Sequence, residues 1–117
     1  MKGTYLGEFE ELALLTVGVL SDNAYGVSVK NEVEHQSGRK ATLSAIHAVL
    51  NRLQEKGFLD STFGPATNER GGKRKRLFKM TNLGKDALKS SRSLRDKLWE
   101  QIPEIVWDSN SVKPIHN

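Results

Sequence analysis

The chain has 117 residues, no cysteine and a formal net charge of +4 at pH 7. A chain of this length builds one modest hydrophobic core, and its longest apolar stretch, residues 12–20, is about half the length of a membrane span. We therefore expect a single small domain with no signal peptide and no disulfide, in a reducing cytoplasmic location, and not a membrane or secreted protein.

The charge is distributed unevenly along the chain. Residues 1–38 carry two basic and six acidic side chains, whereas residues 39–80 carry ten and three, a net charge of +7. Residues 81–117 carry six and five. The basic middle third indicates a polyanionic partner, although a solvated basic surface would have the same composition.

The first predicted helix, residues 7–20, is apolar on two sides. Leu12, Leu15 and Val19 form one stripe, and Leu14 and Val17 lie on another face. A surface helix of a small domain needs only one apolar face. We therefore expect Leu14 and Val17 to contact a second subunit, with burial of both faces inside one chain as the alternative.

Two more helices are predicted before the basic region. Tyr25-Gly26 leads into a short helix with a narrow apolar stripe, which ends at Ser37-Gly38. The next helix runs from Leu43 to Lys56, begins after a cap at Thr42 or Ser44, and stops at Gly57. Its core stripe consists of Leu43, Ile46, Val49, Leu50 and Leu53.

A second face of that third helix is small and polar. At about 100° per residue, Ser44, His47, Ala48 and Asn51 cluster away from the core stripe. Small residues permit close approach to a duplex, and asparagine and serine can hydrogen-bond to base edges. This face is therefore predicted to enter a DNA groove.

The next segment is predicted to be a β-hairpin with strands near residues 58–63 and 74–80. A Gly/Pro/Asn-rich tip joins them, and six cations fall within ten residues. Such a density is self-repelling unless an anion lies nearby, so we favour nucleic-acid binding over a solvated basic face. The six cations are Arg70, Lys73, Arg74, Lys75, Arg76 and Lys79.

The last predicted helix is capped by Thr81 and runs toward Gln101, with Pro103 as its end. Its length would be close to 30 Å, and its apolar stripe is sparse, which suits a projecting helix that packs on a partner through Leu94 and Leu98. Residues 105–107 are an apolar segment expected to dock on the domain or on the other subunit.

This order of elements is that of a winged helix-turn-helix domain: mainly α, with a small two-stranded β wing and a long C-terminal helix. Residues 1–81 would form the DNA-binding domain, and residues 82–107 the dimerisation helix and docking tail. Residues 108–117 are expected to be a disordered tail.

The sequence resembles the PadR family of transcription regulators over roughly residues 6–90. The resemblance rests on Tyr25-Gly26, on the run LSAIHAVLNRLQEKGF that starts at Leu43, and on the basic run from Lys75 to Thr81 followed by Gly84. It implies the compact subgroup, in which a single last helix makes the dimer.

One position departs from the family pattern. The family has Tyr-Pro where this chain has His47-Ala48. Because the family tyrosine contacts DNA, the resemblance implies a DNA contact for His47, with a merely exposed helix residue as the alternative.

We therefore predict a homodimeric, sequence-specific regulator of transcription, a repressor that binds an inverted repeat in double-stranded DNA. Phosphate contacts would give affinity, and base contacts would give sequence choice. Bases would be contacted by Ser44, His47 and Asn51, phosphates by Lys40, Thr42 and Arg52, and the backbone or minor groove by Arg70, Lys73, Arg74, Lys75 and Arg76.

The resemblance also implies control by a small aromatic or lipophilic effector. Trp99 and Trp107 are the candidates to line its pocket, and the plainer account is that they anchor the C-terminal helix. A winged-helix protein-interaction module with no DNA partner is the alternative function. RNA binding is a weaker option, because paired exposed aromatics on a sheet are missing.

No enzyme, cofactor or metal site is predicted. His35, His47 and His116 are dispersed, and the chain has no thiol. His35 lies beside Glu34, but adjacent helical residues diverge by about 100° and would not converge on one ion.

Overall fold

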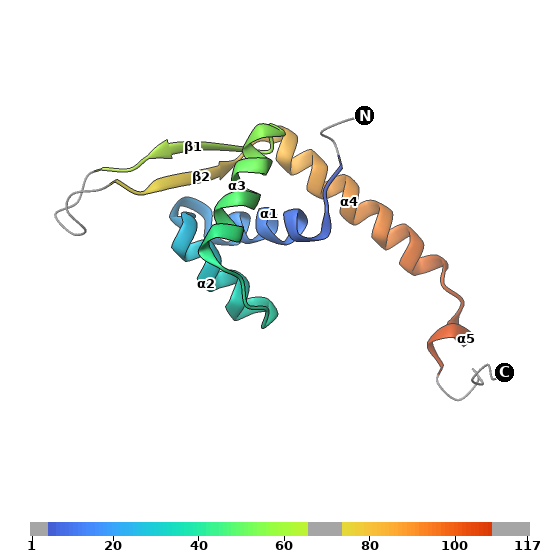
Figure 1. Ribbon diagram of the computed structural model, residues 1–117. Helices are drawn as coiled ribbons and strands as arrows, with labels where there is room; N and C mark the ends of the chain where they lie inside the picture. Colours follow the sequence, from blue (N-terminus) through green and yellow to red (C-terminus); the bar gives the residue numbers. More distant parts are fainter. Residues whose placement is uncertain (1–4, 66–73, 109–117) are drawn as a thin grey trace.

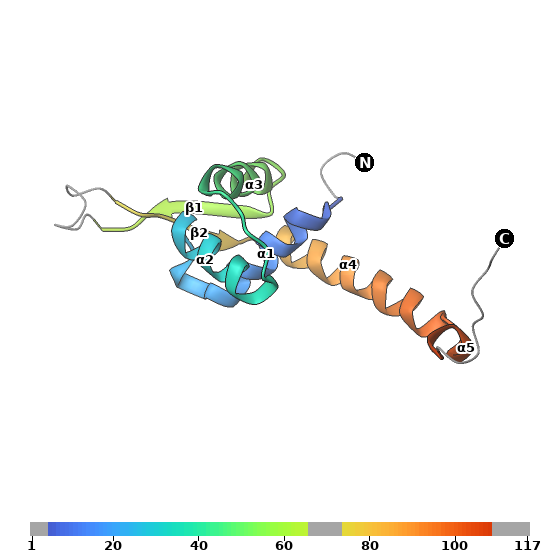
Figure 2. The ribbon, with the colours of Figure 1, turned by 60° about the horizontal axis from the view of Figure 1, so that its bottom comes forward.

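The computed structural model describes residues 5–65 and 74–108. In chain order the elements are α1 (Glu8–Leu20), a 3-10 turn η1 (Ser21–Asn23), α2 (Gly26–Ser37), α3 (Leu43–Glu55), β1 (Leu59–Phe63), β2 (Arg76–Met80), α4 (Asn82–Gln101) and α5 (Glu104–Trp107). Three helices form the body, while the hairpin and α4 extend from it in opposite directions (Figures 1 and 2). The predicted fold class, mainly α with a two-stranded wing, is confirmed.

The hydrophobic core lies between the first three helices and the base of the wing. Each helix turns one apolar stripe inward, and Phe58 and Leu59 close the core from the start of β1. Burial of these side chains is the main stabilising contribution. The fully buried helical residues are Ala13, Leu14, Val29, Val33, Ile46, Val49, Leu50 and Leu53.

The expectation that Leu14 and Val17 contact a second subunit is wrong. These side chains are 0% and 1% exposed inside the single chain. Leu15 and Val19 are instead 48% and 63% exposed. Helical periodicity identified both stripes of α1, but it does not say which one faces the core, and α1 packs on α2 and α3 through the Leu14 side.

Local signals determine where α3 begins and ends. The hydroxyl of Thr42 accepts a hydrogen bond from the backbone N–H of Ala45 at 3.0 Å, so Thr42 is the cap. Gly57 has a φ of +84°, a conformation that favours glycine. The N–H groups of Gly57 and Phe58 donate to the carbonyls of Gln54 and Leu53, which completes a Schellman ending and directs the chain into β1.

The wing is an antiparallel pair in which Leu59 lies opposite Met80 and Phe63 opposite Arg76. Its inner strand is attached to the helical body, because the N–H of Phe78 donates to the carbonyl of Ala24 at 2.8 Å. The wing therefore has a fixed direction relative to α2 and α3.

The base of α4 is fastened to the end of α3. The Thr81 hydroxyl donates to the carbonyl of Gly57 at 2.6 Å and accepts from the N–H of Gly84. A Cβ on Gly84 would lie 2.3 Å from the carbonyl oxygen of Phe58, so only glycine fits there. The spacing of Thr81 and Gly84 is thus explained by a close approach of two backbone segments.

Beyond its base, α4 leaves the body, and α5 lies at its far end (Figure 1). Residues 105–107 therefore pack at the end of the arm and not on the chain's own helical core. The ring of Trp107 packs against that of Trp99, with centroids 4.8 Å apart. Within the described residues, no helix is both long enough and apolar enough to cross a membrane.

One buried carboxylate joins the start of α1 to the end of α3. Glu10 is 7% exposed and accepts from the N–H of Gly7 at 2.8 Å, from Lys56 Nζ at 2.7 Å and from Arg52 Nε at 3.4 Å. Burial raises the pKa of this carboxyl, but the hydrogen bonds from Lys56, Gly7 and Arg52 outweigh it and leave the pKa below its ordinary value of 4.5.

We predict that Glu10→Gln lowers the free energy of unfolding by about 1–2 kcal/mol at neutral pH, because Lys56 loses its charged partner. The lowered pKa means that the carboxylate stabilises the fold above pH 4.5 and stops doing so as the pH falls through the folded pKa. Urea unfolding at neutral pH and well below pH 4.5 should therefore show the difference between variant and wild type shrinking in acid.

The matched control is Glu8→Gln, which removes a carboxylate from an exposed pair with Arg39. Its effect should stay within about 0.5 kcal/mol. If Glu10→Gln lowers the free energy of unfolding by the same amount in acid as at neutral pH, the Glu10 carboxylate does not stabilise the fold through its charge.

Candidate nucleic-acid interface

The small polar face of α3 is free of the core. Ser44, His47, Ala48 and Asn51 are all exposed, while Ile46 on the other side of the helix is fully buried. Helical geometry places these four residues along one side, as their spacing predicts. Their exposure is what a surface that approaches another macromolecule requires.

His47 occupies a defined position over the first turn of α2. A Cβ on Gly26 would lie 2.5 Å from the imidazole Cε1 of His47, so the absence of a side chain at Gly26 makes room for the ring. His47 remains exposed in this position. Gly26 of the aromatic-Gly pair therefore serves the contact between α2 and α3, which no pattern in the sequence indicates.

Arg76 connects the wing to α3. From β2, its guanidinium donates to Asn51 Oδ1 at 3.2 Å, to Gln54 Oε1 at 2.7 Å and, within the wing, to Ser61 Oγ at 3.1 Å. The guanidinium also lies over the ring of Phe78, 5.0 Å from its centroid. The exposed face of α3 and the basic strand thus adjoin, and no signal in the sequence marks Gln54 or Ser61 as partners.

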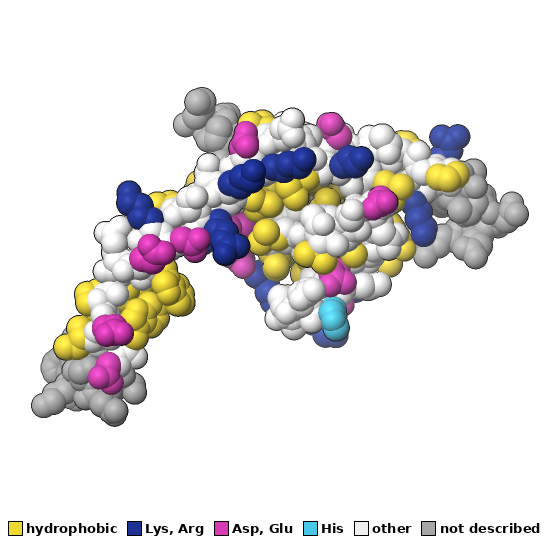
Figure 3. Space-filling view, turned by 180° about the vertical axis from the view of Figure 1, so that it is seen from behind, with side chains coloured by type: hydrophobic (Ala, Val, Ile, Leu, Met, Phe, Trp, Pro, Cys, Tyr) yellow, Lys and Arg dark blue, Asp and Glu magenta, His cyan; other side chains and the backbone are white. Residues whose placement is uncertain are grey.

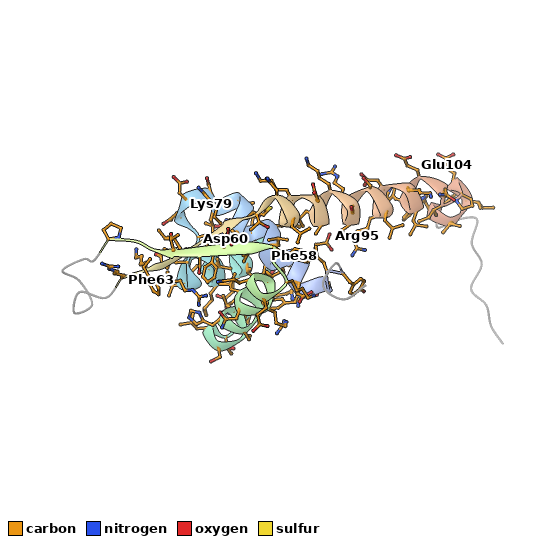
Figure 4. The ribbon with its side chains drawn as sticks, turned by 90° about the horizontal axis from the view of Figure 1, so that it is seen from above. Phe58, Asp60, Phe63, Lys79, Arg95 and Glu104 are labelled. Atoms are coloured by element: carbon orange, nitrogen blue, oxygen red, sulfur yellow. The ribbon has the colours of Figure 1, made fainter. Side chains whose placement is uncertain are left out.

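The other cations of the wing differ in their surroundings. Lys75 Nζ lies 4.3 Å from the centroid of the Tyr25 ring. Arg74 is exposed and has no hydrogen bond or ion pair with another residue of the described ranges. Lys79 projects from the side of the wing away from α3 (Figure 4). Arg70 and Lys73 lie outside the described residues, as does the predicted tail beyond Asp108.

The three residues predicted to hold phosphates sit at the two ends of α3. Lys40 is exposed in the turn before the helix, whereas Thr42 caps it and Arg52 pairs with Glu10. The Thr42 hydroxyl proton and the remaining Arg52 donors are not used by these contacts. All three are exposed, so the structure leaves them accessible.

The turn that carries Lys40 is held by a carboxylate of α2. Glu34 accepts from the backbone N–H of Ala41 at 3.0 Å and pairs with Lys30 at 3.3 Å. The Ala41 N–H and then Lys30 lower the pKa of Glu34. The turn therefore keeps its shape at neutral pH with Lys40 facing solvent.

Together, the fold and this surface define a winged helix-turn-helix protein, with a basic wing beside an exposed third helix. Residues 16–90 match the model of the transcriptional regulator PadR-like family. This match covers more than half of the chain, so the chain belongs to the PadR-like family of transcriptional regulators. No curated protein sequence matches it.

Solved structures show the same fold. A PadR family transcription regulator from Clostridium difficile is 22% identical with a TM-score of 0.61, and the match covers 76% of this chain and 91% of that one. RosR of H. salinarum is 19% identical with a TM-score of 0.66, over 85% and 82%. A PadR-like transcription factor from Bacteroides fragilis is 17% identical with a TM-score of 0.64, over 79% and 84%.

Proposed function

We propose that this regulator is a homodimeric repressor that recognises an inverted repeat in double-stranded DNA. The observation that carries the proposal is the 3.2 Å contact between Arg76 and Asn51, which holds the basic wing against the exposed face of α3. A helix in the major groove and a wing along the adjacent backbone need this juxtaposition.

The roles of the individual residues follow from their positions. Ser44, His47 and Asn51 would face base edges, because they are the exposed polar residues on the outer side of α3. Lys40, Thr42 and Arg52 would hold phosphates near the ends of that helix. Along the backbone or in the minor groove, the wing would contribute Arg70, Lys73, Arg74 and Lys75. Arg76 was predicted with them, but its guanidinium donates to Asn51, Gln54 and Ser61, so we propose a different role for it below.

A second copy of the chain is the proposed partner of α4, with residues 82–107 as the dimerisation arm and residues 1–81 as the DNA-binding domain. Hydrophobic side chains gather along the projecting arm (Figure 3), where Leu94 and Leu98 are exposed. Leu15 and Val19 on α1 take the place of the buried Leu14 and Val17 in this proposal. Such a dimer, bound across a promoter, would repress transcription by excluding the polymerase.

Effector control is a further part of the proposal. Trp99 and Trp107 lie at the end of the arm, and both rings are exposed. A small aromatic or lipophilic compound would insert beside this pair at the dimer interface. The contact between the two rings equally supports their plainer role as anchors of the end of α4.

The function is tested by selecting bound fragments from a pool of random duplexes with the full-length protein. We expect an inverted repeat whose half-sites are separated by about one helical turn, roughly 34–36 Å. A protein-interaction module would enrich no sequence. Failure to recover any preferred duplex would therefore reject sequence-specific regulation.

We predict that Lys40→Gln combined with Arg74→Gln weakens binding to every duplex alike. Removing two phosphate contacts should make the negative slope of log K against log salt shallower by roughly 2. Binding isotherms at several salt concentrations, on the selected site and on a scrambled one, measure both effects.

The control for that double variant is Lys85→Gln combined with Lys89→Gln, which removes the same charge from exposed positions on α4. The control should keep the wild-type slope. Equal slopes for the two double variants would show that the total charge matters and that the proposed interface does not.

We predict that Leu94→Asp combined with Leu98→Asp gives a monomer. Charges at these two apolar positions of the proposed dimer interface should raise the dimer dissociation constant by more than about a hundredfold, as measured by sedimentation equilibrium. Phe63→Asp removes an exposed apolar side chain from β1 and should leave the association unchanged. A double variant that still sediments as a dimer would place the interface elsewhere.

A further inference from the structure

The side-chain amides of Asn51 and Gln54 have a defined orientation because both face the same guanidinium. Arg76 contacts Asn51 Oδ1 at 3.2 Å and Gln54 Oε1 at 2.7 Å. A guanidinium has five N–H donors and no acceptor, so only the oxygen of an amide can face it. The NH₂ groups of both amides are therefore turned away from Arg76.

Arg76 is itself held in place. Its Nε donates to Ser61 Oγ at 3.1 Å on the neighbouring strand, and its plane lies over Phe78, which is buried. All three nitrogens of the guanidinium are engaged within the protein, and the side chain is half-buried. A guanidinium held by this many contacts loses little further conformational freedom when it orients the amide of a neighbouring residue.

We infer that Arg76 is a specificity-determining residue that acts through Asn51, an inference that rests on the proposed DNA-binding function. A free asparagine reads adenine by accepting from N6 and donating to N7. With its oxygen turned toward the wing, Asn51 presents its NH₂ donors to the duplex. Donors match the O6 and N7 acceptors of guanine, so Asn51 selects guanine over adenine at the position it contacts.

This role separates Arg76 from the neighbouring cation of the wing. Arg74 is exposed and has no hydrogen bond or ion pair with another described residue, so its charge is available to phosphate. Arg76 instead uses its donors on the protein. Removing Arg74 should change affinity, whereas removing Arg76 should change the base that is preferred.

The test compares sequence selection by the wild type, Arg76→Met, Arg74→Met and Asn51→Ala. The position read by Asn51 is the one whose preference disappears in Asn51→Ala. There we expect the wild type and Arg74→Met to favour guanine over adenine by roughly tenfold. Arg76→Met should lose this preference, because the amide can then rotate and read adenine.

Arg76→Gln is the second variant, since it keeps a hydrogen-bonding side chain on β2. Its carbonyl can accept from the Asn51 amide and permits the reversed orientation, so adenine should be admitted here too. A wild type that selects adenine at this position, or Arg76 variants that keep the guanine preference, would overturn the inference while leaving DNA recognition intact.

A measurement without DNA tests the contact between Arg76 and Asn51 separately from DNA recognition. The side-chain NH₂ resonances of Asn51 in ¹⁵N-labelled protein should shift in Arg76→Met and stay in place in Arg74→Met. If no duplex is selected, the proposed function fails and the inferred base preference fails with it. Unchanged resonances in Arg76→Met would reject the amide contact directly.

Discussion

The backbone of Gly57 and Phe58 joins the three parts of the molecule that must act together. The carbonyl of Gly57 accepts from the Thr81 hydroxyl, and the carbonyl of Phe58 accepts from the Thr81 N–H at 3.0 Å. The Phe58 side chain is fully buried in the core. The end of α3, the start of β1 and the start of α4 therefore meet at one rigid point, and Gly84 is the residue that lets them approach so closely.

This junction ties the direction of α4 to the position of α3, which carries the proposed DNA-binding face. In a two-fold dimer formed through α4, the separation of the two α3 helices depends on the angle at which α4 leaves the body. Hydrogen bonds at the junction and the pair between Arg95 and Glu11 at 3.0 Å hold that angle. Changes in the arm would thus reach α3 through these contacts, as the proposed control by an effector at the arm requires.

Much of the fold could be predicted from the sequence, because its signals are local. Helical periodicity, the Thr42 cap and the Gly57 stop each act within a few residues, and each is found in the structure. The face of α1 could not be predicted, since periodicity locates stripes without saying what lies opposite them. Leu14 and Val17 were assigned to the wrong side for this reason.

In the candidate site, too, some features follow from local sequence signals and others depend on how the elements pack. The exposed face of α3 follows from spacing alone, but the contacts of Arg76 with Asn51 and Gln54 join residues 25 and 22 positions apart. Such contacts depend on how the wing rests on the helix, which no local pattern encodes. His47 over Gly26 is a contact of the same kind, between two helices whose relative placement the sequence leaves open.

Folding gives the cations of the wing different surroundings. Six cations within ten residues indicated a single basic surface, yet the described ones do different things. Arg76 is used as a connector, Lys75 lies against Tyr25, and Lys79 projects from the far side. The partners of Arg76 and Lys75 are neutral side chains, which fix the position of each cation and leave its charge in place. The positive charge of the described wing therefore remains, while these contacts decide which of its cations keep all their donors free.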